Sequence, residues 1–209
     1  MLRSPLALQR QRGFSLATTL ILLIVVTLLG VAASQLVLTS ERGARHDRDY
    51  KMAYQAAEAA LKDAEFDIAG PNTSGNQRTN YFAAKRNGGV VGWVVAQCGT
   101  SGQMRGLCKA SDKELNQADV WVASWFNFAS TAADAPSARF GEFTGRQFPS
   151  GSGVRPAKLP RYIIEEIDDQ TPGATTDRIV YRVTAIGFGP NENTQVVLQM
   201  IYRKPGIAL

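Results

Sequence analysis

Histidine and cysteine, which supply many of the nucleophiles, bases and metal ligands of enzymes, are nearly absent from this chain. Its 209 residues include one histidine, His46, and two cysteines, Cys98 and Cys108. A Ser/His/Asp site would need His46, which lies in a highly charged stretch shortly after a long apolar run. These three side chains also lack the spacing of a metal-ligand set. GxSxG, P-loop and GxGxxG motifs are missing as well. The sequence therefore predicts no enzymatic activity, no metal and no cofactor.

Charge is absent from residues 14–40, which contain no Asp, Glu, Lys, Arg or His. A helix rises about 1.5 Å per residue, so a helix of this length crosses a hydrocarbon core roughly 30 Å thick. Residues 1–13 in front of it carry three arginines and no acid. The Lys and Arg counts on the two sides do not decide the orientation. However, a short basic segment before an apolar run is how export signals begin, so we expect the leader in the cytoplasm.

The positive net charge gives little support to nucleic-acid binding. The formal net charge is +5, but three of the 23 basic residues lie in residues 1–13, which leaves +2 (20 basic minus 18 acidic) without them. We therefore do not expect nucleic acid as a partner. The two cysteines lie well beyond the apolar run, in the part that would be exported. A lone cysteine pair in an exported domain predicts a disulfide between Cys98 and Cys108.

Helical patterning continues beyond the apolar run, through residues 41–69. Apolar side chains recur at i, i+3, i+4 and i+7 spacing, many of them alanine. The pattern ends at Gly70-Pro71, a strong helix stop. The sequence therefore predicts one helix over residues 14–69, on the order of 80 Å long, whose alanine-rich stripe packs on the chain's own sheet. Glu58 and Lys62 are placed for an i, i+4 ion pair.

Residues 70–209 are expected to form a globular head, and its carboxyl-terminal part has the clearest pattern. Residues 161–168, 178–188 and 194–203 are rich in β-branched and aromatic side chains, which predicts three strands. Residues 189–193 have the composition of a hairpin turn between the last two. The predicted fold class is therefore α+β, with a long amino-terminal helix packed on an antiparallel sheet.

The middle of the chain is less regular. Residues 72–89 are expected to form a polar loop, and residues 90–95 a first strand. Residues 119–128 suggest a second strand or an aromatic-rich turn. Residues 129–160 are rich in Gly, Pro, Ser and Ala and are expected to be an irregular loop. We expect the aromatic residues of this region to pack in the core: Trp93, Trp121, Trp125, Phe126 and Phe128. The oxygen-rich turns that suit calcium are interpreted as ordinary turns: Asp168-Asp169 and Asn191-Glu192-Asn193.

The start of the apolar run has a specific resemblance. Arg12-Gly13-Phe14-Ser15-Leu16 resembles the processing site of type IV prepilins. The resemblance implies that a prepilin peptidase removes residues 1–13 by cleaving after Gly13, and that it methylates the new amino terminus of Phe14. Most pilins have Glu at the fifth mature position, where this chain has Thr18.

Residues 56–65, AAEAALKDAE, resemble the amino-terminal region of the PilX family of minor pilins, and the three carboxyl-terminal strand segments resemble its carboxyl region. That family commonly lacks the fifth-position Glu, so Thr18 fits it. The resemblance implies a type IV pilin-like fold. Residues 14–40 would be the transmembrane and filament-core helix, and residues 41–69 its periplasmic half.

The same resemblance implies a function in assembly. The chain would be a minor pilin that takes part in initiating or assembling a type IV pilus. The neutral Thr18 favours a place at or near the tip, because the first subunit has no earlier neighbour whose amino terminus a Glu would neutralise. The alternative is that the missing charge is tolerated anywhere in the fibre. It would be a single-pass inner-membrane protein with a periplasmic carboxyl-terminal domain, and extracellular after assembly into the pilus. Its expected partners are other minor pilins, the major pilin, a tip-associated adhesin, the prepilin peptidase and the inner-membrane assembly machinery.

Three alternatives stay open on the sequence. The first is a pseudopilin of a type II secretion system, whose tip subunit also lacks the acidic residue but usually carries a larger inserted domain. The second is a competence-type minor pilin that binds DNA, which would need a basic stripe. The third is a membrane-anchored periplasmic enzyme, which would need a catalytic constellation.

Overall fold

The computed structural model describes residues 14–82, 97–109, 136–149, 151–168 and 179–204. The chain divides into two compact units, Met1–His46 and Asp47–Leu209. In the first unit the described residues form the beginning of helix α1 (Phe14–Ala69). The second unit contains the rest of that helix together with a β-sheet.

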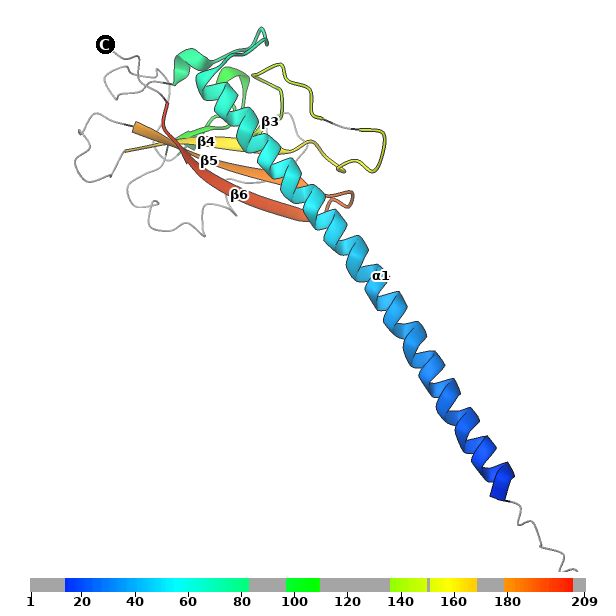
Figure 1. Cartoon of the computed structure of the whole chain (residues 1–209). Helices are drawn as coiled ribbons and strands as arrows, with labels where there is room; N and C mark the ends of the chain where they lie inside the picture. Colours follow the sequence, from blue (N-terminus) through cyan, green and yellow to red (C-terminus); the bar gives the residue numbers. More distant parts are fainter. Residues whose placement is uncertain (1–13, 83–96, 110–135, 150, 169–178, 205–209) are drawn as a thin grey trace, which may run out of the picture. The chain divides into compact units, whose positions relative to one another are not determined.

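Helix α1 is 56 residues long and has the predicted extent (Figure 1). It ends at Gly70, whose backbone has φ of +77°. The Gly70 N–H donates to the carbonyl oxygen of Phe66 at 2.7 Å, which satisfies one of the last helix carbonyls. Glycine adopts this left-handed conformation at low cost, and Pro71 cannot continue the helix.

The second unit holds one six-stranded mixed sheet. Its strands are β1 (Gln97–Cys98), β2 (Leu107–Lys109), β3 (Ala138–Arg139), β4 (Arg161–Asp168), β5 (Ile179–Phe188) and β6 (Gln195–Tyr202). The order is β1-β2-β4-β5-β6, and β3 pairs with β4. The long strands β4, β5 and β6 are antiparallel, whereas β2 runs parallel to β4. The predicted α+β architecture is thus confirmed, with one parallel pair added. The connection between β2 and β4 is long enough to permit it.

The carboxyl-terminal half of α1 packs on the sheet through small side chains. Ala53, Ala57 and Ala60 are fully buried. Gly187 of β5 lies directly against them: a Cβ at this position would stand 2.0 Å from the Ala53 carbonyl oxygen and 2.3 Å from the Ala57 nitrogen. Alanine on the helix and glycine on the strand therefore let the two backbones touch, as the alanine stripe predicts.

Both faces of the central strands are covered. Tyr162, Ile164 and Tyr181 belong to the cluster under the helix. Ile163 and Phe188 belong to a second cluster on the opposite face. Strands buried on both faces appear in sequence as nearly continuous apolar runs, which is the pattern of β5.

The strand predictions differ in outcome along the chain. β4 has the predicted bounds, and β5 and β6 lie within the segments predicted for them. The strand predictions at residues 90–95 and 119–128 lie outside the described residues, as do the aromatic side chains assigned to the core there.

The two segments predicted as loops each contain one very short element. The segment expected to be a polar loop contains the 3-10 helix η1 (Thr79–Tyr81), and the segment expected to be irregular contains β3. Each is only two or three residues long, too short to show a period in the sequence.

The ion pair predicted between Glu58 and Lys62 is wrong: Lys62 pairs with Glu65 at 2.6 Å and not with Glu58.

Candidate functional site

The first functional surface is the apolar part of α1 in the unit Met1–His46. Its large apolar side chains are 47% to 74% exposed, from Ile24 to Leu16. They are Leu16, Leu20, Ile21, Leu22, Leu23, Ile24, Val25, Val26, Leu28, Leu29, Val31, Leu36, Val37 and Leu38. An exposed apolar surface of this extent marks contact with a membrane or with another protein. Among the described residues, α1 alone is long and apolar enough to cross a membrane, which makes it a candidate anchor.

Hydroxyl groups on this surface bond to the helix itself. Thr27 donates to the carbonyl oxygen of Ile24 at 2.8 Å, and Ser34 donates to that of Gly30 at 2.9 Å. Thr19 and Thr39 make bonds of the same kind. A polar group left without a partner in hydrocarbon costs several kcal/mol. These internal bonds therefore give these four hydroxyls a partner when the surface enters an apolar environment.

The residues predicted to govern processing lie at the start of α1. Gly13 is outside the described residues, Phe14 is the first residue of the helix, and Thr18 is exposed. The first turn of the helix contains no acidic residue. A helix amino terminus carries a partial positive charge, so this turn offers no carboxylate to offset it.

The cysteine pair joins β1 and β2, two neighbouring strands at one edge of the sheet. Cys98 of β1 lies opposite Cys108 of β2, and their sulfur atoms form a disulfide with Cα atoms 4.1 Å apart. The turn between the strands is tight, because a Cβ on Gly99 would stand 2.1 Å from the carbonyl oxygen of Met104. The bridge closes a sequence separation of 10 residues and thereby restrains the unfolded chain.

A buried ion pair joins α1 to the loop that follows it. Arg78 Nη2 lies 2.7 Å from an Asp67 carboxylate oxygen, and both side chains are fully buried. Tyr162 donates its hydroxyl to the same carboxylate at 3.0 Å. The Arg78 guanidinium also donates to the backbone oxygen of Gln103 at 2.8 Å and stacks 3.5 Å from the Phe143 ring centroid. Arg78 thus connects the helix, the disulfide-bridged turn and the segment that contains Phe143.

Asp63 fixes a second segment to the same helix. Its carboxylate accepts hydrogen bonds from the Gly141 N–H at 2.7 Å and the Thr144 hydroxyl at 2.5 Å. Burial raises the pKa of Asp63, although these two hydrogen bonds act in the opposite direction. The sequence analysis missed both acids. The available signal was their i, i+4 spacing beside an apolar helix face, where carboxylates need buried partners.

Across the sheet, Glu165 of β4 and Arg182 of β5 form a two-pronged ion pair. The guanidinium nitrogens lie 2.8 and 2.9 Å from the two carboxylate oxygens. Glu165 is only 1% exposed, and burial raises its pKa against the opposing effect of Arg182.

In the part of the chain that the structure describes, no group of three or more His, Cys, Asp or Glu side chains is placed to hold a metal. The carboxylates of Asp63, Asp67 and Glu165 each have hydrogen-bond partners within the head.

Two family models match the chain. The model for the type IV pilus assembly protein PilX C-term matches residues 99–204, and the PilX N-terminal model matches residues 12–62. The first spans strands β2 to β6 and begins just after β1, and the second spans most of α1. Comparison with curated proteins and with solved structures found no match.

Proposed function

This chain belongs to the PilX family of type IV pilus assembly proteins, and we propose that it acts at or near the pilus tip, where it helps to start the fibre. Members of this family are structural minor pilins, so the chain's work is assembly. The observation that supports a role in assembly is the exposed apolar surface of α1, whereas the tip position rests on Thr18. A subunit that must leave a membrane and enter a fibre needs one surface that suits both.

Assembly would move the apolar part of α1 from one apolar environment, the membrane, to another, the core of the fibre. In the inner membrane, the apolar surface of residues 14–40 would face lipid chains. In the fibre, it would face the helices of neighbouring subunits, so little hydrophobic free energy opposes extraction from the membrane. Small residues such as Ala17 and Gly30 would permit close helix approach, and a Cβ on Gly30 would meet no atom within 4 Å in the isolated subunit.

We propose that processing precedes assembly. Cleavage after Gly13 would remove the basic leader, residues 1–13, and leave N-methylated Phe14 at the start of α1. Residues 70–209 would then form a periplasmic head attached by a single membrane span. This topology follows from the basic leader, from the apolar helix behind it and from the disulfide, which forms in an oxidising compartment.

The tip position rests on Thr18. In most pilins the fifth mature residue is Glu, which neutralises the amino terminus of a neighbouring subunit. A buried charge without a partner costs several kcal/mol, so a carboxylate with no amino terminus to meet would be unfavourable. The first subunit of a fibre has no earlier neighbour, and the neutral Thr18 suits that place. The partners would be other minor pilins, the major pilin, a tip-associated adhesin and the inner-membrane assembly machinery.

Gold labelling of sheared fibres tests the position in the pilus. The proposal predicts label at fibre ends, at low copy number. Label spread evenly along the shafts at high copy number would contradict the tip position and leave the family assignment intact.

The family match favours type IV pilus assembly over a type II secretion pseudopilin. Filter binding of DNA at varied salt would test the DNA-binding alternative.

A further inference from the structure

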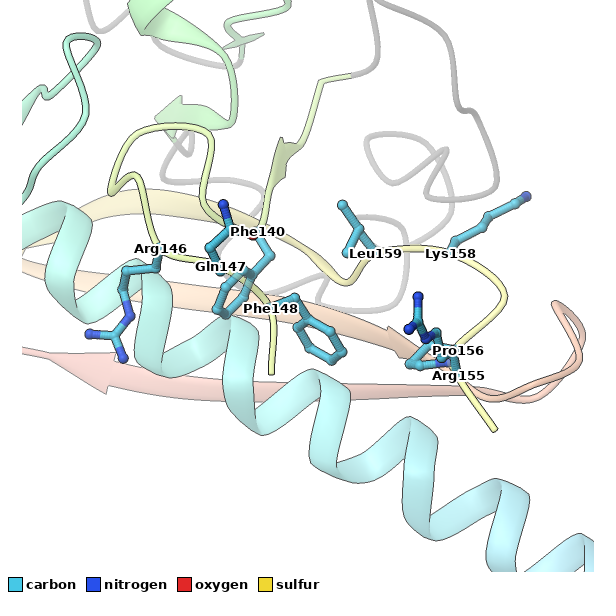
Figure 2. A pocket seen from close by; sticks show the side chains of 8 residues that line it. All are labelled: Phe140, Arg146, Gln147, Phe148, Arg155, Pro156, Lys158 and Leu159. Carbon is cyan, nitrogen blue, oxygen red and sulfur yellow. The ribbon is translucent and has the colours of Figure 1, made fainter. Parts of the chain in front are cut away.

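A pocket of about 330 Å³ lies on the head between two segments that precede β4. Eight residues line it: Phe140, Arg146, Gln147, Phe148, Arg155, Pro156, Lys158 and Leu159. Four are apolar, three are basic, one is an amide and none is acidic. Figure 2 shows the two phenylalanines between Arg146 at one end and Arg155 with Lys158 at the other. The volume is within the range of sites that bind small ligands or single side chains.

Backbone hydrogen bonds hold both walls of the pocket in place. The Phe140 N–H donates to the carbonyl oxygen of Pro160 at 3.0 Å, which ties the two segments together. The Ala157 N–H donates to the carbonyl oxygen of Gly189 at 2.8 Å, which ties the second segment to the end of β5. The rings of Phe140 and Phe148 meet edge to face with centroids 5.3 Å apart. The pocket is therefore preformed, which lowers the entropic cost of binding.

The three basic side chains differ in what they already contact. The Arg146 guanidinium stacks 4.0 Å from the Phe66 ring centroid, and the Lys158 ammonium pairs with Glu192 at 2.8 Å. Arg155 is exposed and makes no hydrogen bond or ion pair with any residue that the structure describes. Stacking leaves the in-plane N–H groups of Arg146 open to a ligand but fixes its position, whereas Arg155 is the cation of the pocket with no such contact among the described residues.

We propose that this pocket binds a carboxylate joined to an apolar or aromatic group, as in a peptide where Asp or Glu adjoins an apolar residue. The Arg155 guanidinium pairs with the carboxylate, a match that its planar fork favours. The apolar group packs on Phe148 and Leu159. The lack of any acidic lining residue leaves the field in the pocket positive, which complements an anion.

Other anions fit this pocket less well. A bare phosphate would leave the apolar walls unfilled, and no helix begins among the lining residues to offer it N–H groups. Single-stranded nucleic acid needs a track of cations along its backbone, whereas here two of the three cations already have partners within the head. The inference depends on the pocket alone and is independent of the chain's place in the fibre.

The test uses the full-length protein in lipid nanodiscs, with N-acetylphenylalanine and its uncharged carboxamide as probes in ligand-observed NMR titrations. Empty nanodiscs serve as the blank. For a probe of this size we expect a Kd on the order of millimolar. The acid should bind about two- to fivefold more tightly than the amide, as a partly exposed charge pair allows. Arg155→Gln should remove that difference and leave amide binding unchanged, whereas Phe148→Ala should weaken both probes.

Arg45→Gln is the matched control, because it removes one exposed arginine outside the pocket and should change neither Kd. Equal affinity for acid and amide in the wild-type protein would overturn the proposal. Equal losses of affinity for the acid in Arg155→Gln and Arg45→Gln would also overturn it. Displacement of the acid by an equal concentration of inorganic phosphate would show a plain anion site instead. Displacement by a micromolar oligodeoxynucleotide would show a nucleic-acid site instead.

Discussion

At the scale of single residues, the stability of the head depends on charges that the fold has buried and paired. Asp67→Asn would leave the Arg78 charge buried without a counter-ion. Breaking a buried pair in this way costs about 3–5 kcal/mol of the free energy of unfolding. Chemical denaturation of the full-length protein in detergent, followed by near-UV circular dichroism, measures the loss.

The control for this variant is Lys51→Gln, which breaks the exposed ion pair between Lys51 and Asp47. An exposed i, i+4 pair contributes under about 0.5 kcal/mol, so this change should be nearly neutral. If Asp67→Asn were as mild as Lys51→Gln, the buried pair would not be what fixes the loop to the helix.

The buried carboxyl of Asp63 predicts a pH dependence. Burial raises its pKa above the ordinary 3.8, with the charge of Asp67 adding to the shift and Arg146 opposing it. The unfolded chain therefore loses this proton first as the pH rises, and deprotonation favours unfolding. The stability from this group is complete below about pH 3.8 and is lost as the pH rises through the raised pKa. Glu165, whose pKa is also raised, acts in the same direction.

Asp63→Asn should therefore reduce the slope of unfolding free energy against pH in the window that begins near pH 3.8 and extends upward. Glu165, whose pKa is raised by burial, would contribute to the slope that remains. Unfolding curves of the two proteins at several pH values measure it. Identical slopes in wild type and variant would contradict a raised Asp63 pKa.

At the scale of elements, the packing of α1 on β5 depends on the absence of a side chain at Gly187. A Cβ there would meet helix backbone atoms, which cannot rotate away as a side-chain end can. Gly187→Ala should therefore cost at least about 2 kcal/mol of stability, in the range of core overpacking. Gly151→Ala is the control, because a Cβ there meets no atom within 4 Å. Equal thermal unfolding midpoints for the two variants would contradict close contact between helix and strand.

The elements also show what the sequence could predict. Helix α1 and strands β4, β5 and β6 have eight or more residues each, so their periodicity and composition were visible. Strands β1, β2 and β3 have two or three residues, too few to show a period, and are defined by their pairing with β2 or β4. The sequence places Arg78 in a predicted polar loop and gives no sign of its burial, because its partner Asp67 is 11 residues away and only the fold brings them together. The pocket likewise needs segments whose proximity depends on backbone hydrogen bonds to Pro160 and Gly189.

At the scale of the whole molecule, the account depends on one chain serving as a membrane anchor and as a fibre subunit. The family match covers both α1 and the sheet, which agrees with the resemblance noted in the sequence. The family could be inferred because its features lie in contiguous motifs around Gly13 and in residues 56–65. The tip position depends on Thr18 together with neighbouring subunits, and the sequence of one chain does not include those neighbours.

The most direct measurement is mass spectrometry of the mature amino terminus, on protein isolated from membranes or from sheared fibres. The account predicts a chain that begins at N-methylated Phe14, because the peptidase would cleave after Gly13. Gly13→Lys should block cleavage, leave the full-length chain in the membrane and stop its entry into fibres. A wild-type mature protein that still begins at Met1 would contradict the proposal that this chain is processed and assembled as a pilin.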